Sequence, residues 1–221
     1  MAFSSVHEMI DLCKESGKPL YEVILESDLA ESGLTRAESE AEMHRLWATS
    51  DGYCGADRSM SGFAGGDAAK VNAAAARGVL YADGYFADVM AEALKTAECN
   101  ACMKRIVAAP TAGSCGVLPA VLLPLQRRGL ADEAAVHRAL YIAAGFGQVV
   151  AARATLAGAE GGCQAEVGAA SGMAAAALVD IKANSGAPIE NKLLYGEIHG
   201  LKKDENGIGL AGTLIGLFRA D

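Results

Sequence analysis

The sequence predicts an all-α fold, a helical domain with glycine-rich turns at helix N-termini. Three observations lead to this prediction. Alanine, glycine and leucine dominate the composition, and aromatic residues make up only 5% of it, which is typical of closely packed helices rather than sheets. Apolar residues recur at helical spacing behind residues that cap helices well. Three glycine-rich segments each stand directly before such a stretch.

Two short helices are expected first. Ser5 and Glu8 have the spacing of a capping box at the start of one helix, and Gly17 ends it. Pro19 can begin the second helix, which is expected to reach about Ala30 and to stop near the following glycine. The apolar face of the first helix is expected to consist of Val6, Met9, Ile10 and Cys13.

A third helix is expected to follow within residues 1–50. Thr35 and Glu38 repeat the capping-box spacing ahead of a stretch that carries Trp47. His7 and His44 lie on these helices, and we interpret them as isolated surface or boundary histidines. The three helices are therefore expected to form a packing or docking unit without catalytic residues.

The first glycine-rich turn lies in "SGFAGGDAAKV", residues 61–71. Asp67 is expected to be the N-cap of the next helix. Backbone amides at such a helix start can hold a carboxylate or a phosphate, although a tight turn without a ligand explains the spacing equally well. The turn is not a P-loop, because the Gly-Lys-Ser/Thr ending is missing.

A long helix is expected from Gly84 to about Ile106, with Cys99 and Cys102 on roughly one face. No second pair accompanies this C-x-x-C, so both residues are interpreted as small buried thiols rather than as half of a redox or metal site. More generally, the six cysteines are interpreted as reduced thiols or ligands rather than as a disulfide framework.

The second glycine-rich turn lies in "APTAGSCGVLPAVLLPL", residues 109–125. Pro110 and Gly113 are expected to shape a loop, and the helix resumes around Pro119. Thr111 and Ser114 place two hydroxyls in this turn, and Ser114 can cap the helix. The segment is therefore a second polar turn at a helix start.

The third turn lies in "LAGAEGGCQAEVGAASGMAAAAL", residues 156–178. Asp132 is expected to cap a helix over residues 133–154, and a further helix should begin near Cys163 or Gln164. The dipole of that helix would stabilise a thiolate, and Gly161 and Gly162 leave room for a bulky ligand. A buried thiol beside a tight turn is the alternative interpretation.

Charge and hydropathy exclude several classes of partner. A net charge of −8 and a pI near 5.1 argue against nucleic acid and anionic membranes. The uncharged stretch 106–126 contains three prolines, so it is interpreted as buried core rather than as a membrane helix. No basic-then-apolar leader follows Met1, so a cytoplasmic location is expected.

Three segments, "SGFAGGDAAKV", "NACMKRIVAAPTAGSCGVLPAVL" and "GAEGGCQAEVGAASGMAAAAL", resemble the α chain, or catalytic domain, of iron–sulfur-dependent L-serine dehydratase. The resemblance implies an all-helical domain over residues 1–180, with N-terminal helices in 1–50 and a catalytic core in 51–180. It implies deamination of L-serine to pyruvate and ammonia with a [4Fe–4S] cluster and no pyridoxal phosphate. The implied partner is a β chain or further copies in a homo-oligomer.

The resemblance also implies roles for individual residues. Cys163 would be a cluster ligand, and Cys115 is the most credible additional or substitute ligand. An iron with an open coordination position would act as a Lewis acid on the serine hydroxyl. The implied substrate-binding residues are Ser61, Gly65, Gly66, Thr111, Gly113 and Ser114.

The sequence departs from the family pattern after Cys163. The resemblance implies two further cysteine ligands downstream, and no cysteine follows Cys163. Residues 181–221 match nothing in the family pattern and are expected to be a truncated, frameshifted or divergent ending. One alternative is therefore an incomplete, inactive remnant that only binds a partner subunit. A pyridoxal-phosphate dehydratase is disfavoured, because no lysine lies in a Schiff-base motif and Lys70 belongs to a glycine-rich turn.

Overall fold

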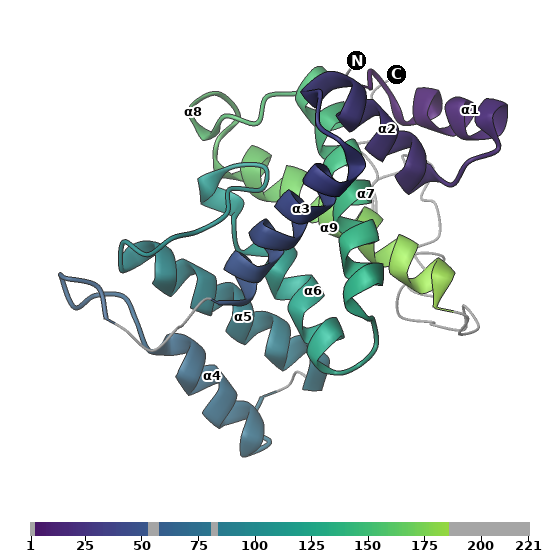
Figure 1. Ribbon diagram of the computed structural model, residues 1–221. Coiled ribbons are helices and arrows are strands. Elements are labelled where there is room, and N and C mark those ends of the chain that lie inside the picture. The colour runs from purple at the N-terminus through teal and green to yellow at the C-terminus, as the bar shows by residue number, and fades with distance from the viewer. Residues whose placement is uncertain (1–2, 53–57, 81–83, 186–221) are drawn as a thin grey trace, which may run out of the picture. The chain divides into compact units, whose positions relative to one another are not determined.

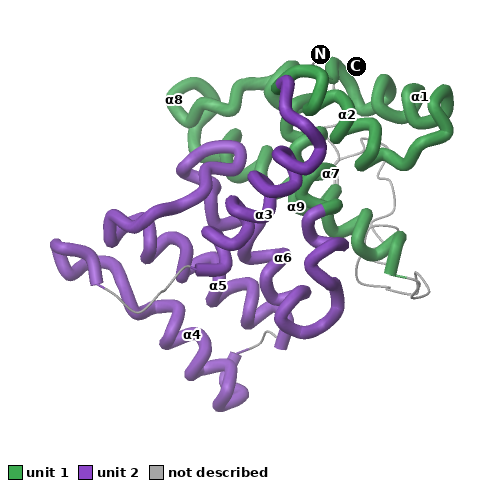
Figure 2. The backbone as a smooth tube through the Cα atoms, in the orientation of Figure 1, with its two compact units in different colours: residues 1–32, 138–221 green, residues 33–137 purple. Residues whose placement is uncertain are grey.

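The computed structural model describes residues 3–52, 58–80 and 84–185, and every regular element in these ranges is a helix. The all-α prediction is therefore confirmed. The chain divides into two compact units (Figure 2). Unit 1 comprises residues 1–32 and 138–221, and unit 2 comprises residues 33–137. The domain boundaries expected from the sequence, at residues 50 and 180, stay a prediction.

Unit 1 contains the two N-terminal helices and the C-terminal helices of the described chain (Figure 1). Small residues cover the buried face of its last helix, which allows neighbouring backbones to approach closely; these are Ala169, Ala170, Gly172, Ala174 and Ala177. The helices of this unit are α1 (Val6–Ser16), α2 (Leu20–Ser32), the greater part of α7 (Glu133–Arg153), α8 (Gly158–Gly161) and α9 (Cys163–Asn184).

Unit 2 is built around α5, which packs against both α4 and α6. Leu118, Leu122 and Leu123 of α6 are buried, so the α6 part of the uncharged stretch 106–126 lies in the core, whereas residues 106–113 are half-buried or exposed. Within the described residues, no helix is both long and apolar enough to cross a membrane. The elements of this unit are α3 (Arg36–Asp51), α4 (Asp67–Ala76), α5 (Gly84–Ala101), the 3-10 turn η1 (Ala112–Ser114), α6 (Val117–Arg127) and the start of α7.

Locally encoded helix starts agree with the sequence. Thr35 and Glu38 form the complete capping box at α3, and Asp132 accepts a hydrogen bond from the amide of Ala135 at 2.8 Å. At α1 the Ser5 hydroxyl caps as expected, but the Glu8 carboxylate accepts from Ser4 instead of closing the box on Ser5. The expected apolar face of α1 is also only partly right, because Met9 is buried whereas Ile10 is 42% exposed.

The helix expected to reach Ile106 ends at Ala101 instead. Met103 adopts a left-handed conformation with φ 59°, and the amide of Lys104 donates back to the carbonyl of Cys99 at 3.0 Å. This backbone arrangement terminates the helix. Cys99 lies inside α5 and is buried as expected, whereas Cys102 lies just beyond the helix end and is only half-buried.

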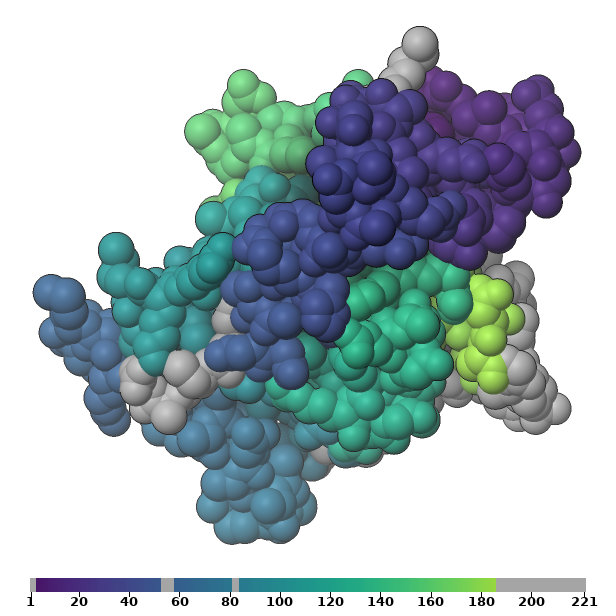
Figure 3. Space-filling model, in the orientation of Figure 1, coloured from purple at the N-terminus to yellow at the C-terminus, as the bar shows by residue number. Residues whose placement is uncertain are grey.

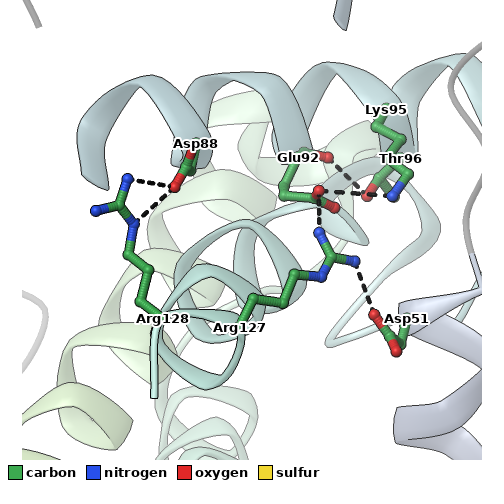
Figure 4. A network of polar contacts seen from close by, with 7 residues as sticks. All are labelled: Asp51, Asp88, Glu92, Lys95, Thr96, Arg127 and Arg128. Atoms are coloured by element: carbon green, nitrogen blue, oxygen red, sulfur yellow. Dashed lines mark hydrogen bonds and ion pairs between the residues drawn. The ribbon is translucent and has the colours of Figure 1, made fainter. Parts of the chain in front are cut away.

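A polar network joins three helices of unit 2 (Figure 4). Arg127 of α6 reaches Glu92 of α5 with one guanidinium nitrogen and Asp51 of α3, at 2.7 Å, with the other. Arg128 pairs with Asp88 of α5 at 2.7 Å. Because Glu92 is buried, its pairing with Arg127 offsets the cost of placing a carboxylate inside the unit.

Two glycines of α7 pack against side chains of different flexibility in unit 1: Gly145 faces Ile24, and Gly147 faces Met173. A Cβ on Gly145 would lie 2.5 Å from Cδ1 and 2.8 Å from Cγ1 of Ile24, whereas one on Gly147 would meet the flexible Met173 side chain at 3.0 Å.

Gly145→Ala should lower the free energy of unfolding by about 1–3 kcal/mol because the branched Ile24 cannot move aside. At Gly147, alanine should gain about 0.5–1 kcal/mol of helix stability and lose little to packing. Urea denaturation of both variants checks this, and equal losses would contradict it.

Candidate functional site

The first glycine-rich turn projects from the rest of unit 2 and leads into α4 (Figure 3). Ser61 is exposed, and its hydroxyl lies 3.1 Å from that of Ser59. Gly65 and Gly66 have φ values of 121° and 85°, a backbone region that side chains disfavour. Glycine is therefore required by the shape of the turn itself, whether or not a ligand binds there.

The residue that caps α4 is not the expected one. The N-cap is Gly66, and Asp67 is the first helical residue, with its carboxylate paired to Lys70 at 2.6 Å. The cap is supplied from α5, because one oxygen of Glu98 accepts the amides of both Asp67 and Ala68, the latter at 3.0 Å. Glycine at the N-cap has no side chain to offer, so the acceptor has to come from elsewhere in the fold.

Glu98 thus fills the anion site that the sequence suggests at the start of α4. Glu98 is only 4% exposed, and its second carboxylate oxygen is buried and has no hydrogen-bond partner among the described residues. A substrate carboxylate cannot use the same two amides while Glu98 holds them. The first turn offers a substrate its exposed edge at Ser61 rather than its helix N-terminus.

The second turn is closed by its own hydroxyls. The Thr111 and Ser114 oxygens lie 3.2 Å apart, and Ser114 is 2% exposed while Gly113 is exposed. Ser114 does not cap α6 as expected, because the N-cap is Gly116 and η1 intervenes between the loop and the helix. The accessible part of this turn is the edge that runs from the half-buried Thr111 to the exposed Gly113.

One stretch of α5 supports both of these turns. Glu98 holds the first turn, and a Cβ on Gly116 in the second would lie 3.4 Å from Thr96 and from the carbonyl oxygen of Ala93. An added Cβ would be in ordinary van der Waals contact at these distances, so the second turn packs directly against α5. Two of the three glycine-rich turns therefore contact the same helix, α5.

The third turn ends in an exposed thiol. Cys163 is the first residue of α9, as expected, and it follows Gly162, whose φ of 72° and ψ of 172° suit glycine. The short helix α8 precedes it and was not expected from the sequence. Cys163 belongs to unit 1, whereas the other candidate site residues belong to unit 2.

The described cysteines supply one accessible cluster ligand. Cys163 is the exposed cysteine in the described part of the chain, while Cys99 and Cys115 are buried. Burial raises the pKa of the Cys115 thiol, which disfavours the thiolate that binds iron. A [4Fe–4S] cluster takes several thiolates, so these residues fit one ligand position and do not complete a set.

His44, Glu133 and His137 form a group of potential metal ligands that was not predicted from the sequence. His44 of α3 lies beside Glu133 and His137 of α7, so His44 is not isolated as expected. The available signal was the i, i+4 spacing of Glu133 and His137, repeated by Glu40 and His44, because this spacing puts each pair on one helix face.

The fold and site define a class of all-helical protein in which glycine-rich turns lead into helices and one turn ends in an exposed cysteine. The chain matches the family model described as serine dehydratase alpha chain over residues 15–196, and it belongs to this family. The match extends beyond residue 180, where the motifs alone placed the end of the resemblance.

Curated relatives agree with this membership. The chain is 36% identical over 185 residues to the L-serine dehydratase, alpha chain, of Peptoniphilus asaccharolyticus, covering 80% of this chain and 63% of that one. It is 38% identical over 184 residues to the probable L-serine dehydratase, alpha chain, of Bacillus subtilis, covering 81% and 61%. It is also 31% identical over 201 residues to L-serine dehydratase TdcG of Escherichia coli, covering 86% and 43%. The chain therefore spans less than two thirds of the length of these relatives.

The cap on α4 can be tested by substitution. Glu98→Ala should lower the free energy of unfolding by about 2–3 kcal/mol, because two amides lose a charged acceptor. Glu98→Gln keeps one acceptor oxygen and should cost less. Asp67→Asn is the matched control and should change stability little, because its exposed ion pair lies outside the cap. Guanidinium denaturation measures all three, and a larger loss for Asp67→Asn than for Glu98→Ala would show that Asp67 is the cap after all.

Proposed function

We propose that this chain is the α chain of an L-serine dehydratase, which deaminates L-serine to pyruvate and ammonia. One observation carries the proposal. The family match over residues 15–196 includes all three glycine-rich turns, and relatives that share it are named L-serine dehydratases. Because the chain spans only part of those relatives, we place the complete activity in an assembly with a β chain or with further copies of this chain.

The proposed cofactor is a [4Fe–4S] cluster, and pyridoxal phosphate is not involved. The cluster would supply an iron with an open coordination position, which acts as a Lewis acid. Cys163 supports the proposal as one ligand, since it is exposed and flanked by a glycine that leaves space beside it. The other ligands would come from outside the described residues, because Cys99 and Cys115 are buried and Cys13 and Cys102 are half-buried.

In this proposal the turns of unit 2 bind and orient L-serine. The accessible edge from Thr111 to Gly113 offers a hydroxyl and backbone groups, and the buried Ser114 hydroxyl holds Thr111 in place at 3.2 Å. Ser61 would contribute a second, exposed edge, while the buried Gly65 and the N-cap Gly66 would act by shaping the turn behind it. Glu98 would keep this edge in position by fixing the start of α4 to α5.

Anaerobic reconstitution with iron and sulfide tests the cofactor. With a β chain from a relative present, the unmodified chain should gain the broad visible absorption of an iron–sulfur cluster, and Cys163→Ser should lose it, because a serine oxygen is a poor substitute for a soft thiolate ligand. Cys102→Ser is the matched control, because Cys102 is half-buried beyond the end of α5, and it should retain the absorption. Equal absorption in Cys163→Ser and in the unmodified chain would sink the assignment of this ligand.

A serine-to-pyruvate assay of the same samples tests the activity. With a β chain from a relative added, pyruvate formation should follow the iron content of the variants. The chain alone should retain the cluster poorly and turn over serine more slowly than with its partner, because one exposed thiolate does not hold a cluster firmly. A stoichiometric cluster without pyruvate formation in either sample would instead favour the inactive remnant that only binds a partner subunit.

A further inference from the structure

Two imidazoles and a carboxylate converge at the junction of α3 and the start of α7, within unit 2. Nδ1 of His44 lies 2.8 Å from Oε1 of Glu133, and Nε2 of His137 lies 3.7 Å from the same oxygen. One ligand atom from each of the three residues lies within 4.8 Å of the other two. We call these three residues the histidine cluster.

A simple ion pair does not account for this arrangement. The pairing of His44 with Glu133 leaves His137 Nε2 buried and without a hydrogen-bond partner among the described residues. The His137 ring instead meets the edge of the His44 ring, with centroids 5.5 Å apart. A buried ring nitrogen without a hydrogen-bond partner is costly, and a cation held between it, the carboxylate and the second imidazole would supply that partner.

Burial lowers the pKa of His137, while the carboxylates of Glu133 and Glu40 raise it and His44 lowers it further. The net direction of the pKa shift is downward, which favours the neutral imidazole. A neutral imidazole is the form that binds a metal ion.

We propose that His44, Glu133 and His137 bind a divalent transition-metal ion, with Zn²⁺ the best match to the donors. Two imidazole nitrogens and one carboxylate oxygen are typical zinc ligands, and bonds of about 2.0–2.1 Å in a tetrahedron place donors about 3.3 Å apart. The three ligand atoms now lie within 4.8 Å of one another, and rotation of the exposed side chains of His44 and Glu133 would shorten the distances between them. The fourth position is open to water or to Glu40, which lies one helical turn before His44.

This site is distinct from the proposed cluster site. It contains no cysteine, and its hard and borderline donors do not select iron–sulfur clusters. A metal ion here would join α3 to the start of α7 and so stabilise unit 2. The inference does not depend on the proposed serine dehydratase activity, because its test measures metal binding and thermal stability alone.

Titration of the full-length, metal-free chain with Co²⁺ tests the site by spectroscopy, and competition with Zn²⁺ gives the zinc affinity. Nitrogen and oxygen ligands give weak visible cobalt bands, whereas thiolate ligands add intense near-ultraviolet bands, so the six cysteines are distinguished from the histidine cluster. His44→Ala and His137→Ala should each weaken binding at least about 100-fold, since even loss of an outer partner of a ligand costs about 10–100-fold.

His7→Ala is the matched control. His7 pairs with Asp11 at 3.2 Å in the same i, i+4 spacing but belongs to no such cluster in the described residues, so its loss should leave the affinity unchanged. His44 is 61% exposed, so His44→Ala should keep the metal-free melting temperature while losing the rise that Zn²⁺ gives the unmodified chain. Equal affinities in the unmodified chain and in His44→Ala, or binding only through thiolates, would overturn the proposal.

Discussion

The carboxylate of Glu98 is the constraint on which unit 2 depends. The first glycine-rich turn needs positive φ at Gly65 and Gly66, which removes any side chain from the cap position of α4. The amides at the start of that helix then require an acceptor from outside the turn, and α5 provides it. The glycine turn can therefore form at low cost only when α4 packs against α5, because Glu98 then accepts the amides at the start of α4.

The three glycine-rich turns differ in what they leave for a ligand. The first has its helix N-terminus filled by Glu98, and the second is closed by the Thr111 and Ser114 hydroxyls beside a buried thiol. The third ends in Cys163, exposed at the start of α9. Similar sequence patterns thus produce two turns whose polar groups are used within unit 2 and one that ends in an exposed cysteine.

Local signals in the sequence predicted local structure well. Thr35 and Asp132 cap helices through residues three positions away, so their roles can be deduced from spacing. Asp67 was wrongly expected to cap α4 because the true cap, Glu98, lies 31 residues further along the chain. The histidine cluster was missed for the same reason, since only the packing of α3 beside the start of α7 brings its members together. The roles proposed for Cys163 and the substrate turns rest on resemblance and stay predictions.

The central claim is that Cys163 is the thiol through which this chain takes part in iron–sulfur chemistry. Mapping the rate of alkylation at each cysteine under native, anaerobic conditions tests it most directly, because reaction requires an accessible thiolate. Cys163 should react before the other cysteines of the described residues, Cys99 and Cys115 should react only as the chain unfolds, and reconstitution with iron and sulfide should protect Cys163. Alkylation of Cys115 as fast as Cys163, or no protection of Cys163 after reconstitution, would contradict the account.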